Sequence, residues 1–262
     1  MGHGLSTRTD TLEERLRADG ELRLVPYLMA GYPDQEASVA LGRRLARSGA
    51  AALEIGIPFS DPLADGPVIQ QAGQAALEAG ATTQACLEVA ARIAGAGGAA
   101  LVLMTYVNPI LAYDARRFAA DAASAGVRGV IIPDLPPEEA EPTAGWLRAA
   151  GLDVIFLVAP TSTDERVAAA SQASSGFVYC VTVTGTTGVR ASLPTDLRQV
   201  LARIRARTSL PIAAGFGISR PEHLEVLRGA ADAAVVASAL VVEVQAGRDP
   251  VRLVDRLLDA CR

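Results

Sequence analysis

Acidic side chains gather around one apolar stretch in the first quarter of the 262-residue chain. Glu54 interrupts the apolar run from Ala51 to Ile55, where an ionised carboxylate without a partner would be costly to bury. Asp61 and Asp65 follow on a loop that prolines stiffen. A glutamate in a strand and aspartates on the next rigid loop can hold carboxylates in different environments, which general acid–base catalysis uses.

Each of these acids also has a purely structural interpretation. Glu54 could pair with an arginine or lie at a sheet edge, and an aspartate beside proline or glycine commonly stabilises a turn. Strand alternation predicts only that Glu54 lies on the face opposite Leu53 and Ile55. The residues by themselves leave both interpretations open.

Glycine-rich segments later in the chain could bind phosphate through the backbone. Gly185-Thr186-Thr187-Gly188 and Gly215-Phe216-Gly217 each follow an apolar run, and Ala237-Ser238 opens a helical segment after the last one. Free amides and the helix dipole favour an anion at such positions. One glycine pair is ordinary at a turn, but the three segments together predict a phosphate site that needs no cationic side chain.

The basic residues narrow the chemistry further. All 24 are arginines, so an imine-forming aldolase, a pyridoxal-phosphate enzyme and a P-loop lysine are excluded for this chain. A net charge of -5 without a basic block makes nucleic acid or an anionic membrane an unexpected partner. Two histidines are too few for a multi-histidine zinc site. Three cysteines without CxxC spacing predict buried thiols and a cytoplasmic protein.

Short apolar runs must position these groups. Each run is closed by turn residues and followed by an amphipathic segment. The eight runs are residues 22–29, 51–55, 100–104, 129–132, 154–158, 177–181, 211–214 and 233–236. Apolar strands that alternate with helices predict a parallel sheet covered on both faces. Eight such units predict an α/β fold with one (β/α)8 TIM-barrel domain over residues 1–262 and an active site at the carboxyl ends of its strands.

Further segments predict additions to this barrel. Residues 11–19 predict an extra N-terminal helix that caps the barrel floor, after a loose tail at residues 1–10. The connection between the second and third strands is long enough for two helices, so additional short helices are expected. Hydroxyl residues followed three positions later by glutamate predict capping boxes at Thr11, Ser162 and Ser219.

Together these residues resemble one enzyme family. The string PFSDPLADGP, at residues 58–67, closely resembles the signature of the tryptophan synthase α subunit. The likeness continues through residues 25–27, 30–33, 106–109, 134–136, 179, 185–188, 214–219 and 238–239. The signature combines several prolines and acids at fixed positions, so it is far more specific than the glycine segments, which many phosphate-binding barrels share.

The resemblance implies a lyase of tryptophan biosynthesis that cleaves indole-3-glycerol phosphate to indole and glyceraldehyde 3-phosphate in a retro-aldol-type reaction. It implies that Glu54 is the general acid toward indole C3 and the base toward the glycerol hydroxyl. Asp65 would hold the indole N–H and stabilise the positive charge of the ring. The implied binding residues are Tyr27, Met104, Tyr179 and Thr187 for the substrate and Gly188, Gly217, Ala237 and Ser238 for its phosphate.

The resemblance also has implications for assembly. The family works as an α2β2 heterotetramer whose β subunit carries pyridoxal phosphate, so this chain is expected to need no cofactor of its own. Pro58, Asp61 and Asn108 match positions that face the β subunit. Ala237 stands where many members have glycine, and its amide remains usable if its φ angle is negative. Two alternatives stay open: a catalytically silent phosphate-binding barrel that regulates a β subunit, and another phosphosugar-binding barrel enzyme.

Overall fold

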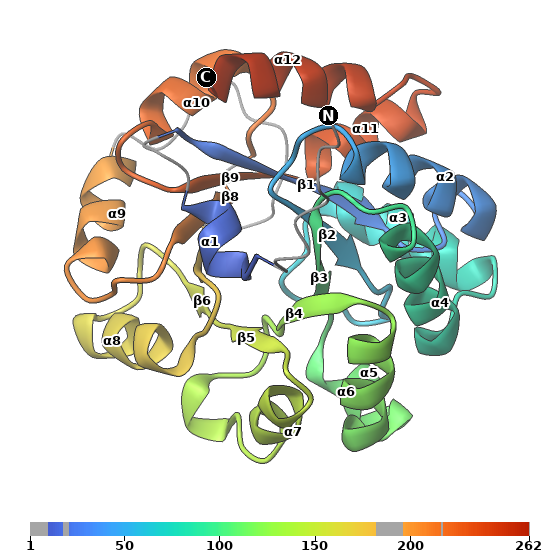
Figure 1. The fold of residues 1–262 in the computed structure, drawn as a ribbon, viewed down its shortest axis with the longest axis horizontal. Coiled ribbons are helices and arrows are strands. Elements are labelled where there is room, and N and C mark those ends of the chain that lie inside the picture. The colour runs from blue at the N-terminus through green and yellow to red at the C-terminus, as the bar shows by residue number, and fades with distance from the viewer. Residues whose placement is uncertain (1–9, 18–20, 182–195, 216, 262) are drawn as a thin grey trace, which may run out of the picture.

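The strands form a parallel ring with helices around it, in a computed structural model that describes residues 10–17, 21–181, 196–215 and 217–261 (Figure 1). The strands are β1 (Arg23–Met29), β2 (Ala52–Gly56), β3 (Ala100–Met104), β4 (Val127–Ile131), β5 (Asp153–Ile155), β6 (Leu157–Val158), β7 (Val178–Val181), β8 (Ile212–Gly215) and β9 (Ala233–Val236). They pair in the order β5-β4-β3-β2-β1-β9-β8-β7-β6.

The nine strands correspond to the eight predicted runs, since β5 and β6 are two pieces of the single run predicted at residues 154–158. The first piece pairs with β4 and the second with β7, and only Phe156 separates them. The two ends of the sheet therefore meet at this interrupted strand. The predicted α/β (β/α)8 TIM barrel is confirmed.

Helices form the outer layer of the ring, except α1, which lies over its centre (Figure 1). The helices are α1 (Leu12–Leu16), α2 (Gln35–Ala46), α3 (Pro67–Glu78), α4 (Thr83–Ala94), α5 (Val107–Tyr113), α6 (Ala115–Ser124), η1 (Pro137–Glu139), α7 (Thr143–Ala149), α8 (Asp164–Ala173), α9 (Leu197–Arg205), α10 (Pro221–Leu227), α11 (Ser238–Gln245) and α12 (Val251–Cys261). As predicted, two helices, α3 and α4, fill the long connection after β2. Within the described part of the chain, no helix is both long and apolar enough to span a membrane.

Alternation along the strands divides the core into an outer and an inner part. Leu53 and Ile55 belong to the outer cluster, which packs under the surrounding helices. Val102 and Phe177 belong to the cluster inside the barrel. Glu54 stands between two outward-facing residues and lines the interior cavity, which confirms its predicted direction.

The helix α1 closes the amino-terminal end of the barrel, as predicted. Leu12 and Leu16 are buried in the cluster of inward-facing strand residues. A side chain at Gly129 would collide with Leu12, since a Cβ there would lie 2.9 Å from Leu12 Cδ1. Thr11 and Glu14 form the predicted capping box, which satisfies amides at the first turn of this short helix.

The other two capping-box predictions were wrong in position. Thr163, not Ser162, caps α8, while the Ser162 hydroxyl accepts a hydrogen bond from a loop amide. Arg220 is the N-cap of α10 and no side chain caps that helix, although Pro221 occupies its first turn. A hydroxyl group close to a helix start can bond to loop backbone instead, so spacing alone does not identify the N-cap.

The three cysteines behave as the sequence predicts. Cys86, Cys180 and Cys261 are buried and free. Burial raises the pKa of the Cys86 and Cys180 thiols to about 12. Both side chains therefore remain neutral and pack as small hydrophobic groups.

Leu16→Ala tests how much α1 stabilises the barrel. The side chain of Leu16 is fully buried, with 0% exposed, so its truncation leaves a cavity. We expect the free energy of unfolding to fall by about 2–4 kcal/mol in urea denaturation. Leu111→Ala is the control, because Leu111 is 53% exposed and its truncation should change the stability by less than about 0.5 kcal/mol. Parent-like stability of Leu16→Ala would contradict the role of α1.

Candidate active site

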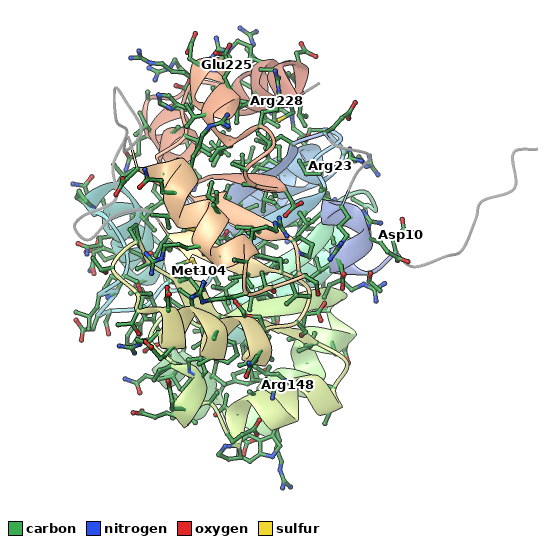
Figure 2. All side chains as sticks on the ribbon, turned by 90° about the vertical axis from the view of Figure 1, so that its left-hand side faces the viewer. Asp10, Arg23, Met104, Arg148, Glu225 and Arg228 are labelled. Atoms are coloured by element: carbon green, nitrogen blue, oxygen red, sulfur yellow. The ribbon has the colours of Figure 1, made fainter. Side chains whose placement is uncertain are left out.

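A cavity of about 800 Å³ opens at the carboxyl ends of the strands. This volume lies in the range of small-molecule sites, roughly 300–1,000 Å³. The predicted site residues that line it are Tyr27, Glu54, Asp65, Met104, Tyr179, Gly217, Ala237 and Ser238. Met104, at the end of β3, lies toward the middle of the molecule, whereas Arg148 and Glu225 lie at its periphery (Figure 2). Closure of the barrel thus brings together residues that are far apart in the sequence.

Glu54 is buried without a partner for one of its oxygens. Its side chain is 1% exposed, and Oε2 has no hydrogen-bond partner among the residues that the structure describes. Its neighbours in register are Tyr27 on β1 and Val102 on β3, so Glu54 does not lie at a sheet edge. Burial, and then the charge of Asp65, raise the pKa of Glu54 to about 8. Among the described residues Glu54 forms no salt bridge, so that interpretation finds no support there. Its raised pKa favours the neutral, protonated side chain near pH 7.

Asp65 is partly exposed on the loop between β2 and α3, residues 57–66, called here the Asp65 loop. Its N–H donates to the Pro62 carbonyl at 3.0 Å, and the Gln70 side-chain amide donates to the Asp65 carbonyl at 2.9 Å. Burial raises the pKa of Asp65 to about 6, and hydrogen bonding with Tyr106 opposes this shift. Asp65 is therefore largely ionised at neutral pH, in contrast to Glu54.

Two buried tyrosines flank these carboxyl groups. For Tyr27 on β1 and Tyr179 on β7, burial and the charges of the two acids raise the pKa well above its usual value, so both phenols stay neutral. Each ring depends on a glycine in the adjacent strand. A Cβ on Gly56 would overlap the Tyr27 hydroxyl, and a Cβ on Gly215 would lie 2.7 Å from Tyr179 Oη. These glycines leave the space into which the hydroxyl groups reach.

Two of the predicted phosphate residues, Ala237 and Ser238, lie at the amino-terminal end of α11. Ala237 is the N-cap, and no side chain of the described residues caps the helix. Its φ of -115° is negative, as a usable amide requires here. Gly217, with φ of 65°, also lines the cavity in a left-handed conformation that favours glycine. The helix dipole and uncapped amides can therefore bind an anion without a cationic side chain.

Comparison with known proteins identifies the family. The sequence profile of the tryptophan synthase alpha chain matches residues 14–262. The chain is 47% identical to the tryptophan synthase alpha chain of Acidiphilium cryptum, over 94% of this chain and 91% of that one. It is 46% identical to the alpha chain of a Roseiflexus species, over 94% and 95%. The chain belongs to the tryptophan synthase alpha chain family.

Solved structures of the family have the same fold. A tryptophan synthase structure from Mycobacterium tuberculosis matches with a TM-score of 0.89 and 39% identity, over 96% of both chains. An alpha-subunit mutant from Pyrococcus furiosus matches with a TM-score of 0.84 and 34% identity, over 91% of this chain and 98% of that one. The resemblance drawn from the signature at residues 58–67 is thereby confirmed.

The other five predicted site residues of this member of the tryptophan synthase alpha chain family fall into three groups. Thr187 and Gly188 lie outside the described residues. Asp61 and Asn108 are exposed, and their contact with a partner stays a prediction. Pro58 is buried in this chain, and a Cβ on Gly73 would lie 3.9 Å from the Pro58 Cβ, so a contact of Pro58 with a partner stays a prediction.

Two residues that hold the Asp65 loop escaped the sequence analysis as functional candidates. The Tyr106 hydroxyl accepts a hydrogen bond from Ala64 N–H at 3.1 Å, across 42 positions of sequence. Gln70 holds the Asp65 loop from the first turns of α3. The family likeness of residues 106–109 was a signal for Tyr106, but a contact at this separation leaves no local pattern.

Glu54→Gln should stabilise the fold at alkaline pH. The pKa of Glu54 is higher in the folded chain, so stability falls as pH rises from the ordinary value of 4.5 toward about 8. Glutamine has no such ionisation. In urea denaturation we expect parent and variant to be similar near about pH 5, and the variant to be more stable by several kcal/mol near about pH 9.

The matched control for this stability measurement is Glu78→Gln, at an exposed position on α3. It should follow the pH dependence of the parent. A difference between parent and Glu54→Gln that does not change with pH would show that Glu54 does not titrate as a buried group.

Proposed function

We propose that this chain catalyses the α reaction of tryptophan biosynthesis, the cleavage of indole-3-glycerol phosphate to indole and glyceraldehyde 3-phosphate. The observation that carries the proposal is the pair of carboxyl groups in one cavity, with Glu54 neutral and Asp65 ionised. The cavity also reaches the uncapped amino-terminal end of α11. It therefore offers acid–base groups for the ring and an anion site for the phosphate.

In this mechanism Glu54 is first an acid and then a base. Its proton passes to C3 of the indole, and the ring becomes an indolenine with positive charge at N1. The Glu54 carboxylate then takes the proton of the hydroxyl on the glycerol carbon attached to C3. The bond from that carbon to C3 breaks, its electron pair restores the indole ring, and the oxygen becomes the aldehyde oxygen of glyceraldehyde 3-phosphate. Glu54 ends the cycle protonated.

Asp65 supplies electrostatic stabilisation. Its carboxylate accepts the indole N–H and faces the positive charge that develops at N1. A fixed charge aimed at charge that grows in the transition state is typically a large contribution to catalysis. Because the protonated ring takes up the electron pair, no imine is needed, which agrees with a chain that contains no lysine. We propose that the chain uses no cofactor of its own.

The same proposal assigns the binding residues. The phosphate binds to amides around Gly217, Ala237 and Ser238, together with Gly188. The indole ring lies against Tyr27, Met104 and Tyr179, and Thr187 helps to position Asp65. The cavity lining supports these assignments for all but Gly188 and Thr187, which lie outside the described residues.

The two alternatives fit the site less well. A catalytically silent regulatory barrel has no need of a buried glutamate with an unsatisfied oxygen, which lowers stability. Perturbed carboxyl groups in a cavity are typical of catalytic sites. Another phosphosugar-binding barrel would share the anion site at α11 but not the signature at residues 58–67.

The proposal includes a β subunit as partner, in an α2β2 heterotetramer in which the partner holds the pyridoxal phosphate. Among the described residues, the exposed large hydrophobic side chains are Leu63, 82% exposed on the Asp65 loop, and Leu111, 53% exposed on α5. Asp61 and Asn108 are exposed on the same loop and helix. Apolar side chains with polar neighbours are typical of protein interfaces. The buried thiols support a cytoplasmic location for such a complex.

Replacement of either carboxyl group should remove most of the activity. Glu54→Gln has no proton to exchange, and we expect kcat to fall by about 10³-fold or more. Asp65→Asn should lose several kcal/mol of transition-state stabilisation. Steady-state release of indole from indole-3-glycerol phosphate measures both, with and without a β subunit, and Glu78→Gln is the control at an exposed site. A parent that releases no indole under either condition would exclude the lyase.

The pH profile of the same reaction tests the assigned protonation states. The rate of the parent should rise as Asp65 ionises, near its pKa of about 6, and fall as Glu54 loses its proton, near about 8. In Asp65→Asn the charge that helps to raise the pKa of Glu54 is gone. The alkaline limb of the residual activity should therefore move to lower pH, and a limb that stays in place would argue against the pairing.

Leu111→Arg tests the partner surface. An arginine at this exposed apolar position should weaken binding of the β subunit by about ten-fold or more, since it places a charge in the contact. Titration with the β subunit while indole formation is followed measures the affinity. Gln84→Arg on α4 adds the same charge at another exposed position and should bind like the parent. Equal binding by the parent and Leu111→Arg would contradict this surface.

A further inference from the structure

We infer that Tyr106 is a positioning residue for Asp65, because its hydroxyl group and its ring hold the loop that carries this acid. The inference rests on the proposed function, because it concerns the orientation of the carboxylate that faces the indole ring. Tyr106 itself is not among the residues that line the cavity, so it acts through Asp65 rather than on substrate.

The hydroxyl group of Tyr106 makes two contacts with the Asp65 loop. It accepts a hydrogen bond from Ala64 N–H at 3.1 Å. The same hydroxyl interacts with the Asp65 carboxylate, and this interaction lowers the pKa of Asp65 against the effect of burial. The hydroxyl therefore fixes the Leu63–Ala64 peptide beside Asp65 and favours the ionised form of the acid.

The ring of Tyr106 contacts the start of the same loop. Its centroid lies 5.2 Å from that of Phe59, with the two planes at 34°. Tyr106 is 3% exposed, so this contact is buried. Gln70 holds the loop only through main-chain carbonyl oxygens, those of Pro62 and Asp65. The contacts of Tyr106 thus join the beginning of the loop to its catalytic end.

The backbone around Tyr106 is held independently of the loop. Tyr106 is the N-cap of α5, and its side chain does not cap that helix. The Asp134 carboxylate, on the segment after β4, accepts the Val107 N–H at 2.9 Å in its place. The hydroxyl of Tyr106 is consequently free for the Asp65 loop, while its main chain is anchored to a different part of the barrel.

Tyr106→Phe tests the inference, because it keeps the ring and removes the hydroxyl. We expect kcat for indole release to fall about ten-fold with KM changed by less than about three-fold, since the hydrogen bond serves a charged group that acts in the transition state. The acid limb of the pH profile should move to higher pH, because a donor that favours ionised Asp65 is lost. A ¹³C NMR titration of the Asp65 carboxyl in the ligand-free chain should show the same upward shift.

Tyr113→Phe is the matched control on the same helix. The Tyr113 hydroxyl donates to Asp121 at 2.8 Å, away from the cavity, so its removal should leave kcat, the acid limb and the Asp65 titration as in the parent. If Tyr106→Phe does not fold, Phe59→Leu loosens the ring contact and keeps the hydroxyl, and it should lower kcat in the same direction.

A Tyr106→Phe variant with a parent-like acid limb and a parent-like Asp65 titration would overturn the inference, even if its stability or KM changed. The NMR titration does not depend on turnover. A parent that releases no indole would therefore count against the proposed function, while the Asp65 titration would still test Tyr106.

Discussion

The neutral, buried carboxyl group of Glu54 is the constraint on which the rest of the site depends. Its position inside the barrel, with Oε2 unpartnered, makes the ionised form unfavourable and keeps a proton available near neutral pH. The same burial destabilises the folded chain as pH rises, so the barrel must supply the stability that this residue removes. The charge of Asp65 adds to the shift, and therefore the two acids must be held at a defined separation.

The barrel can accommodate the buried Glu54 because the two ends of its interior are built differently. At the amino-terminal end, α1 inserts Leu12 and Leu16 among inward-facing strand residues and closes the core. At the carboxyl end, the strands carry tyrosines, glycines and Glu54 around an open cavity. Close packing at one end allows an incompletely satisfied polar site at the other, which is a common division in barrel enzymes.

The cavity combines two carboxyl groups with a helix start that favours anions, and it does so in a chain that contains no lysine. Two carboxyl groups and the amino-terminal end of α11 line the same cavity, and in the proposed reaction they would face the indole ring and the phosphate. The Asp65 loop joins this chemistry to the surface, because it carries the exposed Leu63 and is hydrogen-bonded through Tyr106 to the helix that carries Leu111. A partner on that surface would contact the elements that orient Asp65.

The sequence by itself determined the positions of the strands along the chain, the inward direction of Glu54, a closing helix before the first strand and the family. These follow from local periodicity and from a short signature, both of which are properties of neighbouring residues. Only the tertiary structure decided that Glu54 has no salt-bridge partner among the described residues, that Pro58 is buried in this chain, that Thr163 rather than Ser162 caps α8, and that Tyr106 reaches Ala64. Such facts depend on which side chains meet when the barrel closes, and residues far apart in sequence carry no local record of that meeting.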